Sequence, residues 1–511
     1  MVYRIKELVR GALSGELTPR VLKSNYLERA VNLVEKTIKD GQISLVQGPP
    51  GTGKTTVFEI SIDDLFDSIS SDFIVLYEAP TNKLVADMLK RVVLMYKKRD
   101  KINDISEEIR VYGSQFDYTD YGKMADKVDR NVKLILTTDY QRPYFTTNKP
   151  LCQLVDEASK TPLHQPYIPF TGKIIQAIGR SELHCMSVIG DPKQAITLGH
   201  HYREEGENLL ILNSFIKGYL MMMGVNIFGE VDETELARKH LSGKVYEFLE
   251  ITHRMPHPTE VAISEAYYGG WLRSATTVNE RLKNIWDKSI ASRLSVINGK
   301  FQKAVQIVED AITTSRGIIY VKINQDYPYG EEENAFLFEP SRAEAGIYLA
   351  TCLSAITHMK CAVLTTYTDQ WQQMKLMSQK DIVPMVKSAV PEIEDLVYFG
   401  TVDKQLGSEE EIIVCILGKE ASTKDNPTRY FKEPELLNVQ LSRHRRLLCI
   451  VGNLVKLRNT ARKLDSDLAT TKFREIAEVS ETLLKQAGFD IYKREARRAR
   501  TGDVCVFSEW S

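Results

Sequence analysis

The sequence has no excess of charge of either sign and no paired cysteine motif. Its 511 residues include 67 Lys and Arg against 68 Asp and Glu, which gives a net charge of -1. That balance argues against a uniformly basic nucleic-acid-binding protein, so any site for nucleic acid must be a local patch. The seven cysteines are scattered without a C-x-x-C pair. This spacing argues against a zinc site or a disulfide framework and predicts buried free thiols in a reducing compartment.

Long apolar runs are also missing. The most apolar stretch, residues 209–228, is interrupted by Asn213, Lys217 and Asn226, so we expect a buried helix rather than a membrane span. The first eleven residues contain basic side chains but no apolar core of signal-peptide length. We therefore expect a soluble, cytoplasmic or otherwise intracellular protein without a membrane partner.

The length of the chain is sufficient for two to four domains. Short β-rich runs alternate with helical patterns, which predicts an α/β fold of parallel sheets covered by helices on both faces. The runs form two series: residues 43–46, 73–77, 132–136, 151–155 and 186–189, then residues 318–321, 361–364, 396–398, 412–417 and 447–451. We expect a first domain over 1–250, a second over 251–485 and a basic tail over 486–511. The basic clusters at 97–101 and 493–500 are either solvated surfaces or binding sites.

The sharpest local pattern is GPPGTGKTT, which follows the apolar run ISLVQ and precedes a helical stretch. It matches G-x-x-x-x-G-K-[ST] in the strand–loop–helix context of a phosphate-binding loop. Inward-facing backbone N–H groups and the helix N-terminus attract phosphates. Lys54 is expected to reach the β- and γ-phosphates, and Thr55 to ligate magnesium; the alternative is a glycine-rich turn with an accidental lysine. The nucleotide-binding residues predicted from the pattern are Gly48, Pro49, Pro50, Gly51, Thr52, Gly53, Lys54, Thr55 and Thr56.

Two later strand ends supply the other groups that triphosphate hydrolysis needs. In LCQLVDEAS, Asp156 is the predicted metal-linked carboxylate and Glu157 the predicted general base. Alone, the pair could simply cap the next helix. In SVIGDPKQ, Gln194 could contact the terminal phosphate or the attacking water, whereas the alternative is an ordinary Gly-Asp-Pro turn.

The order GPPGTGKTT, APTN, DEAS, GDPKQ, THRMPHP, TVDKQLGSEE and LNVQLSRHRR resembles the superfamily 1 helicases of the up-frameshift type, over roughly residues 25–453. The resemblance implies two RecA-like P-loop NTPase domains that bind ATP and Mg²⁺. It implies that Arg254 and Arg443 contact the γ-phosphate, as planar guanidinium donors can. Without the resemblance, SRHRR could be a solvated basic helix. It further implies that Glu409 holds the ribose and that Gly407 approaches a phosphate, although Gln405 and Leu406 depart from the family's F-Q-G.

The resemblance also points to contacts with single-stranded nucleic acid, by short hydroxyls and amides that bond phosphates without reading sequence. Each threonine could instead be a helix cap or a strand residue, and the tyrosine could stack on a base or pack. The residues so implicated are Thr81, Asn82, Thr137, Thr138, Tyr367 and Thr401.

The resemblance therefore implies an ATP-hydrolysing motor that moves 5′ to 3′ on single-stranded DNA or RNA and unwinds tailed duplexes, and we expect it to act as a monomer. Relatives often place a stalk and a small β-barrel before the phosphate loop, and only a short segment precedes Gln47. This motivates the alternative of a nucleic-acid-stimulated ATPase that remodels nucleoprotein with little unwinding. A nucleotide-dependent clamp without turnover is a further alternative. Residues 92–131 are a possible insertion, either a wedge or a plain helical hairpin, and residues 200–244 are a second.

Overall fold

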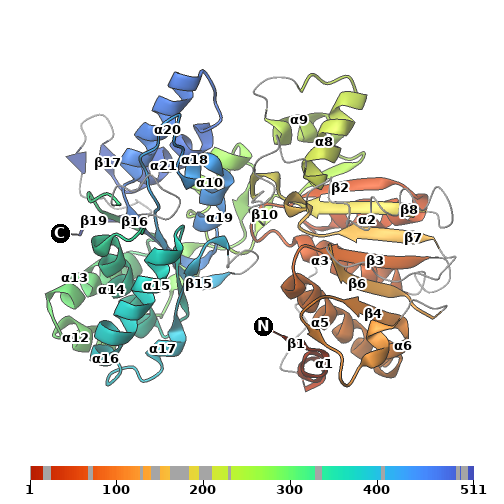
Figure 1. Ribbon diagram of the computed structural model, residues 1–511, viewed down its shortest axis with the longest axis horizontal. Helices are drawn as coiled ribbons and strands as arrows, with labels where there is room; N and C mark the ends of the chain where they lie inside the picture. The colour runs from red at the N-terminus through yellow and green to blue at the C-terminus, as the bar shows by residue number, and fades with distance from the viewer. Residues whose placement is uncertain are drawn as a thin grey trace. The chain divides into compact units, whose positions relative to one another are not determined.

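The structure is a computed structural model, in which the chain forms two compact units, Met1–Glu250 and Ile251–Ser511 (Figure 1). It describes residues 2–14, 25–66, 73–126, 131–139, 150–161, 183–194, 210–227, 232–327, 336–403, 409–490, 495–496 and 505–510. The cluster at 493–500 therefore lies almost wholly outside the described residues, as do Gln405, Leu406 and Gly407.

The first unit is built on a seven-stranded sheet in which every pair is parallel, in the order β4-β6-β3-β7-β8-β2-β9. Its strands are β2 (Ile43–Gln47), β3 (Ile74–Ala79), β4 (Ile109–Tyr112), β6 (Leu134–Thr138), β7 (Leu151–Val155), β8 (Leu183–Gly190) and β9 (Tyr246–Phe248). The interior strand β3 is buried along its whole length, which is why its first four residues, 74–77, read as a continuous apolar run. A short parallel pair, β1 (Tyr3–Arg4) and β5 (Phe116–Asp117), completes the strands described in this unit.

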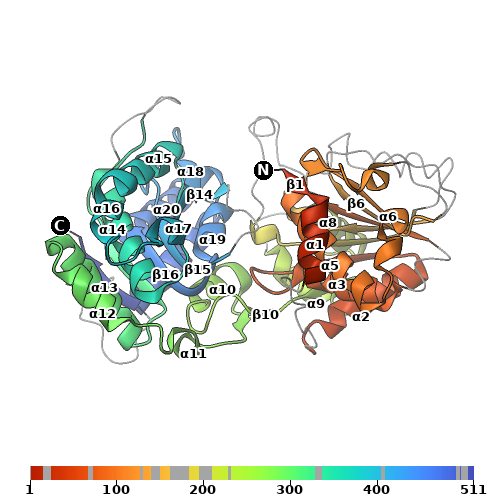
Figure 2. The same ribbon diagram turned by 90° about the horizontal axis from the view of Figure 1, so that it is seen from below.

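Helices α2 (Glu28–Asp40), α3 (Lys54–Asp64) and α5 (Asn82–Lys98) form one layer on this sheet, and α1 (Ile5–Ser14) packs against α5 (Figure 2). Helix α2 buries Ala30, Val34 and Ile38 at four-residue spacing and ends at Gly41, whose φ of 66° suits glycine. These apolar positions join the main core of the unit. The short helix α6 (Ile105–Glu108) and two longer helices, α8 (Ile211–Met222) and α9 (Glu233–Leu241), complete the α-helices among the residues described in this unit.

The second unit has a six-stranded sheet, again with every pair parallel, in the order β14-β13-β15-β16-β12-β19. Its strands are β12 (Ile318–Lys322), β13 (Cys361–Thr365), β14 (Val397–Thr401), β15 (Glu410–Ile416), β16 (His444–Gly452) and β19 (Cys505–Glu509). The small pairs are β10 (Ile251–Thr252) with β11 (Arg273–Ser274), and β17 (Phe489–Asp490) with β18 (Glu495–Ala496). The fold class predicted from the sequence is confirmed in both units.

Helices cover both faces of the second sheet (Figure 1). On one face, α12 (Lys288–Ser295), α13 (Gly299–Thr313) and α14 (Pro340–Thr357) share a large apolar core with the sheet. On the other, α21 (Arg474–Gln486) packs against both α10 (Val261–Tyr268) and α20 (Leu454–Leu468). The remaining helices are α11 (Val278–Leu282), α15 (Thr368–Met377), α16 (Val383–Val386), α17 (Ile393–Leu396), α18 (Arg429–Lys432) and α19 (Glu435–Leu441).

Three peripheral segments contribute described elements to the two units. Residues 92–131 are not an inserted wedge or hairpin, because they supply the second half of α5 and then β4, the edge strand of the central sheet. In the 200–244 region, α9 is tied to the sheet by a 3.1 Å hydrogen bond from Gln47 Nε2 to Thr234 Oγ1. The end of the expected tail is not free either, since β19 pairs with β12.

The stretch expected as a fully buried helix is amphipathic in the structure. Helix α8 buries Ile211, Ile216 and Leu220, but Met222 is 73% exposed. Across the described residues, no helix combines the length and the apolar character needed to cross a membrane. All seven cysteines are buried and free, as predicted.

Candidate functional site

The predicted phosphate-binding loop connects β2 to α3 in the first unit. Gly53 has a φ of 91° and precedes the first residue of α3, a conformation that a side chain would strain. A Cβ on Gly48 would lie 2.4 Å from Lys54 Cγ, so glycine there lets the lysine fold across the loop. Lys54 Nζ donates to the Gly48 carbonyl at 2.8 Å. Thr52 closes the turn with a 2.8 Å bond from its Oγ1 to the Pro49 carbonyl.

The acidic pair follows β7 and lies against this loop. Thr55 Oγ1 and the Tyr77 hydroxyl each donate to Asp156 Oδ2 at 2.8 Å. The Glu157 N–H donates to the other carboxylate oxygen of Asp156, Oδ1, at 2.8 Å. Complete burial raises the pKa of Asp156 and the charge of Glu157 raises it further, whereas the Tyr77 and Thr55 hydrogen bonds and the Lys54 charge lower it. The structure thus joins the predicted metal ligands Thr55 and Asp156 directly.

Glu157 is held between two lysines. Its Oε1 lies 3.5 Å from Lys54 Nζ, and its Oε2 accepts a 2.9 Å hydrogen bond from Lys160 Nζ. The Lys160 side chain is only 3% exposed, so this ion pair is shielded from water and weakly screened. Glu157 has φ 50° and ψ 37°, a left-handed conformation that costs about 1–2 kcal/mol for a residue with a Cβ. Strain of this kind is concentrated at functional sites.

Gln194 lies at the end of a short 3-10 turn after β8, and its Nε2 donates to Asp191 Oδ2 at 2.6 Å. The Asp191 N–H in turn donates to Ser159 Oγ at 3.0 Å. The GDPKQ turn is therefore bonded to the DEAS segment. Gln194 therefore belongs to a Gly-Asp-Pro turn, and that turn is also joined to the segment that carries the acidic pair.

In the second unit, the structure pairs Arg254 with Glu409. Arg254 Nε donates to Glu409 Oε2 at 2.8 Å, and its Nη1 donates to the Ser442 carbonyl at 3.1 Å. Arg445 Nε lies 3.8 Å from the other oxygen of Glu409. The predicted arginine finger and the predicted ribose carboxylate are thus neighbours in one ion-pair network.

Arg443 is buried, with 3% exposure, and its Nε donates to the Val439 carbonyl at 2.9 Å. The segment is not a solvated basic helix, because α19 ends at Leu441 and β16 begins at His444. His444 is also fully buried; burial and the Arg254 charge lower its pKa to about 3, although its hydrogen bond with the Leu441 carbonyl raises it. Within SRHRR, Arg443 and His444 are therefore buried inside this unit, whereas Arg445 and Arg446 are partly exposed.

The residues implicated in nucleic-acid contact lie at strand ends and helix starts. Thr81 caps α5 by accepting a 3.4 Å hydrogen bond from the Leu84 N–H, which is the helix-cap role given above as the alternative. Asn82 Nδ2 donates to Ser114 Oγ at 3.5 Å. Thr137 and Thr138, at the end of β6, are buried with exposures of 0% and 4%, so neither presents its hydroxyl at the surface in this structure.

Two further candidates of this kind belong to the second unit. Tyr367 follows β13, and its ring packs edge-on against Tyr327 with centroids 5.3 Å apart. Its hydroxyl accepts a 3.2 Å hydrogen bond from the Lys419 N–H. Thr401 ends β14 in register with Thr365 and is 5% exposed. Both residues lie at the carboxyl edge of the sheet, and Tyr367 packs against protein in this structure.

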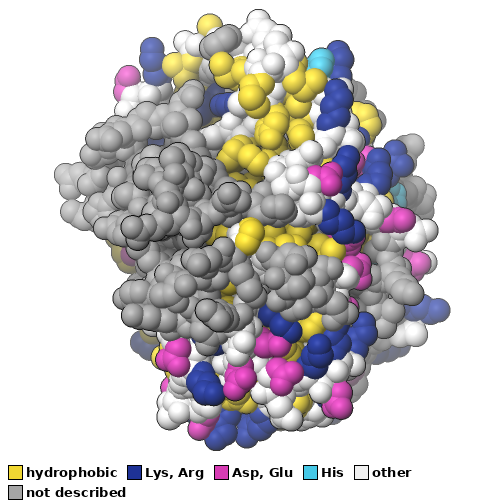
Figure 3. Space-filling view, turned by 90° about the vertical axis from the view of Figure 1, so that its right-hand side faces the viewer, with side chains coloured by type: hydrophobic (Ala, Val, Ile, Leu, Met, Phe, Trp, Pro, Cys, Tyr) yellow, Lys and Arg dark blue, Asp and Glu magenta, His cyan; other side chains and the backbone are white. Residues whose placement is uncertain are grey.

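Charge on the face shown in Figure 3 is mixed, with basic and acidic side chains interspersed among the described residues. This mixture fits the balanced composition, since the described residues of that face form no single broad basic surface. Among the described residues, no group of three or more His, Cys, Asp or Glu is placed to hold a metal ion. Thr55 and Asp156 would therefore need phosphate oxygens and waters to complete a magnesium shell, as is usual for Mg²⁺.

Comparison with known proteins agrees with the tandem arrangement of these sites. A family model described as "AAA domain" matches residues 28–161, and a second model of the same description matches residues 231–455. In this order the two models are the pair found in up-frameshift-type helicases. The chain belongs to the superfamily 1 helicases of the up-frameshift type.

This helicase-family chain is similar to the DNA polymerase alpha-associated DNA helicase A of Schizosaccharomyces pombe, with 23% identity over 84% of the chain. The chain spans 64% of the length of that curated relative. Among solved structures, S. cerevisiae Dbp5 bound to RNA and ADP BeF3 matches with 11% identity and a TM-score of 0.37, covering 94% of this chain and 97% of that one. A variant of Dbp5 in the same complex matches at 13% identity and the same TM-score of 0.37, with the same coverage. A TM-score this low does not by itself establish a shared fold.

Several residues of this helicase-family site were not singled out in the sequence. Tyr77 lies inside β3, and in the sequence it looks like one more core residue of an apolar run. Lys160 directly follows DEAS, and this adjacency was a usable signal. Asp139 follows Thr138 and accepts a hydrogen bond from Thr161. Burial raises the pKa of Asp139 to about 7, while the Thr161 bond lowers it and the charge of Asp156 raises it.

Proposed function

We propose that the chain is an ATP-dependent helicase that translocates 5′ to 3′ on single-stranded DNA or RNA and unwinds duplexes. The observation that carries the proposal is the assembled acidic pair of the first unit. Asp156 is bonded to Thr55 of the phosphate loop, and Glu157 lies beside Lys54 of the same loop. A nucleoside triphosphatase needs this combination of phosphate clamp, metal carboxylate and base. The family of the chain connects that chemistry to nucleic acid.

The residues at the loop fit a bound Mg²⁺–ATP complex. Hydroxyl and carboxylate oxygens are the ligands that Mg²⁺ prefers, and Thr55 and Asp156 place such oxygens 2.8 Å apart. Burial raises the pKa of Asp156, so a cation at this point would relieve the cost of its charge. When bound, the metal would neutralise phosphate charge during transfer. Thr55 and Asp156 would hold it, and Lys54 would turn from the Gly48 carbonyl to the phosphates.

Glu157 is proposed as the base that orients and deprotonates the attacking water. Its carboxylate is fixed by Lys160 at 2.9 Å, so it is positioned before nucleotide arrives. Arg254 and Arg443 of the second unit are proposed to stabilise charge on the transferred phosphoryl group. Gln194 is proposed to sense the terminal phosphate from the GDPKQ turn, which is bonded to the DEAS segment through Asp191.

The direction of movement and the strand contacts rest on the family alone. We propose Thr81, Asn82, Thr137, Thr138, Tyr367 and Thr401 as the first residues to vary for nucleic-acid binding. The buried threonines at the end of β6 would have to become exposed to serve this role. We propose a monomeric motor, which sedimentation at working concentration would test.

The experiment is steady-state ATP hydrolysis with Mg²⁺, with and without single-stranded DNA or RNA, together with strand displacement on 5′-tailed and 3′-tailed duplexes. The proposal expects stimulation by single strands and displacement only from the 5′ tail. Stimulation without displacement would favour the remodelling ATPase, and displacement from the 3′ tail would contradict the polarity. Hydrolysis that ignores nucleic acid would contradict the helicase proposal while leaving the nucleotide site intact.

A further inference from the structure

Two adjoining cavities open along the second unit on the side where its parallel strands end. The first encloses about 180 Å³ and is lined by residues that include Tyr327, Lys419 and Thr428. The second encloses about 430 Å³ and is lined by residues that include Lys322 and Lys463. Lys456 lines both cavities, so they adjoin at this side chain, and we name the two together the lysine groove.

The lysine groove follows from the topology of the sheet. Strands β15, β16 and β12 are neighbours and parallel, so their carboxyl ends lie along one edge. Lys419 comes three residues after the end of β15, and Lys322 is the last residue of β12. Between them, β16 ends at Gly452 and leads into α20, which carries Lys456.

One face of helix α20 is polar and lines the groove. Lys456, Asn459, Thr460 and Lys463 line the second cavity. Their spacing of three, four and seven residues places them on one face over two turns, about 10 Å of helix. Leu457, Ala461 and Leu464 on the other side of α20 are buried. A row of ammonium, amide and hydroxyl groups on a concave surface can bond successive phosphates of a strand without reading its bases.

The charge of the groove is positive once its internal pairs are considered. Four lysines line it against two carboxylates, Asp326 and Glu420, and one of the four, Lys322, is paired at 3.2 Å with Glu509. Glu420 is already neutralised by the buried Arg342, with N–O distances of 2.7 and 2.9 Å. Asp326 pairs with Lys456, but the Asp326 side chain is 50% exposed. Exposed pairs contribute little stability and exchange readily for another anion.

The groove continues directly from a residue implicated in strand contact. The Lys419 N–H donates to the Tyr367 hydroxyl at 3.2 Å, and Tyr327 of the groove packs against the ring of Tyr367. Thr428 Oγ1 donates to the Lys419 carbonyl at 3.2 Å. A strand that crosses the ends of β13 and β14 therefore meets the lysine groove next along the same edge.

We propose that the lysine groove binds the phosphate backbone of a single nucleic-acid strand and lengthens the strand-binding site beyond Tyr367 and Thr401. This inference rests on the proposed function. An ordinary solvated helix face is the competing explanation for the lysines of α20. A solvated face is convex, whereas these side chains line a cavity of about 430 Å³, within the size range of ligand sites.

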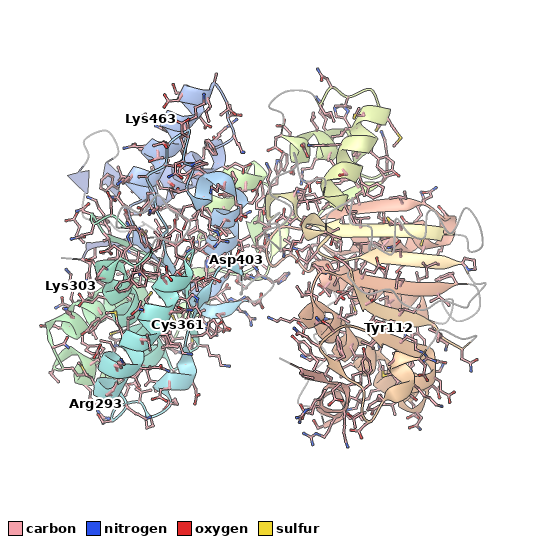
Figure 4. All side chains as sticks on the ribbon, in the orientation of Figure 1. Tyr112, Arg293, Lys303, Cys361, Asp403 and Lys463 are labelled. Atoms are coloured by element: carbon pink, nitrogen blue, oxygen red, sulfur yellow. The ribbon has the colours of Figure 1, made fainter. Side chains whose placement is uncertain are left out.

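The test compares two double variants of the full chain. Lys456→Ala/Lys463→Ala removes two ammonium groups of the groove, and Arg293→Ala/Lys303→Ala removes two cations from α12 and α13. Lys463, Arg293 and Lys303 are labelled in Figure 4, which shows the control residues on different helices from the groove. Binding of fluorescein-labelled oligo(dT) and oligo(U) is measured over a series of lengths and salt concentrations.

The groove variant should bind long oligonucleotides about tenfold more weakly than the wild type. Its slope of log affinity against log salt should be shallower by about 1.4, since each phosphate contact to a single strand contributes about 0.7. Short oligonucleotides, which are held by the other contacts, should bind almost equally. The control variant should retain both the wild-type affinity and the wild-type slope.

Two results would overturn the inference. If the groove variant matches the control for every length, the lysines of α20 form a solvated surface and the strand ends before them. If the wild type binds no single strand, the proposed function fails and the groove proposal fails with it. Lys463→Glu gives an independent check, because a reversed charge should weaken the binding of long strands more than Lys463→Ala does.

Discussion

Replacing Tyr77 by phenylalanine should weaken the use of Mg²⁺ by the ATPase while leaving the fold intact. The tyrosine hydroxyl donates at 2.8 Å to Asp156 Oδ2, the oxygen that also accepts from Thr55. Both Tyr77 and Asp156 have exposures of 0%, so water does not readily replace the lost donor. Phenylalanine keeps the ring and its edge-on contact with Phe58.

The size of the effect follows from the loss of one hydrogen bond to a charged group. Such a bond contributes about 1.5–3 kcal/mol, and each 1.4 kcal/mol is a factor of about ten in affinity. Without the hydroxyl, the pKa of Asp156 should rise further above its already raised value, so a proton competes better with the metal. We expect the Mg²⁺ concentration for half-maximal hydrolysis to rise about 10- to 100-fold, the usual range for lost partners of metal ligands.

The assay is a Mg²⁺ titration of ATP hydrolysis at saturating ATP for the wild type and two variants. Tyr96→Phe is the matched control, because Tyr96 is buried in the same unit and donates at 2.9 Å to Glu108. The control should keep the wild-type Mg²⁺ dependence. An unchanged Mg²⁺ dependence in Tyr77→Phe would refute the assignment of Asp156 as the metal-linked carboxylate.

Three other predictions concern buried charges. Lys160→Met should lower kcat at least tenfold with little change in KM for ATP, because Glu157 loses the 2.9 Å bond that positions it; a changed KM with normal kcat would contradict this. The free energy of unfolding should fall by about 3 kcal/mol between pH 7 and pH 4 through His444, since the unfolded chain takes up a proton below its pKa of about 6.5 and the folded chain only near 3. In denaturant unfolding, His444→Gln should lack this fall of about 3 kcal/mol between pH 7 and pH 4. If the variant and the wild type show the same pH dependence, His444 is not its source. Arg342→Met should cost about 3–5 kcal/mol by leaving Glu420 buried and unpaired, and Arg342→Met/Glu420→Leu should recover most of that loss in denaturant unfolding.

The fold could be predicted because parallel strands buried on both faces read as continuous apolar runs. IVLY at residues 74–77 of β3 and IIVCI at residues 412–416 of β15 are examples. The weaker strands were missed for a physical reason. IRVY in β4 is four residues long and contains a buried arginine, and CVFSE in β19 lies after a basic stretch that reads as a tail. Edge strands of this kind depend on the neighbour they pair with, which local sequence does not reveal.

The candidate site was predictable where chemistry depends on adjacent residues. The phosphate loop fixes Lys54 and Thr55 by spacing alone, and the acidic pair is next to it because both follow strands of one sheet. Partners contributed by distant segments could not be predicted. Tyr77 reaches Asp156 across 79 residues of sequence, and Glu409 meets Arg254 across 155. Such pairs depend on the register between elements, which only the folded chain defines.

The central claim is that the acidic pair and the phosphate loop form a working ATPase driven by nucleic acid. The most direct measurement is ATP hydrolysis with saturating single-stranded nucleic acid for the wild type, Lys54→Ala and Glu157→Gln, with nucleotide binding measured in parallel. Loss of the base should lower kcat by about 10²–10⁴ while Glu157→Gln still binds ATP, and Lys54→Ala should lose hydrolysis with weakened binding. Wild-type turnover in either variant would contradict the account.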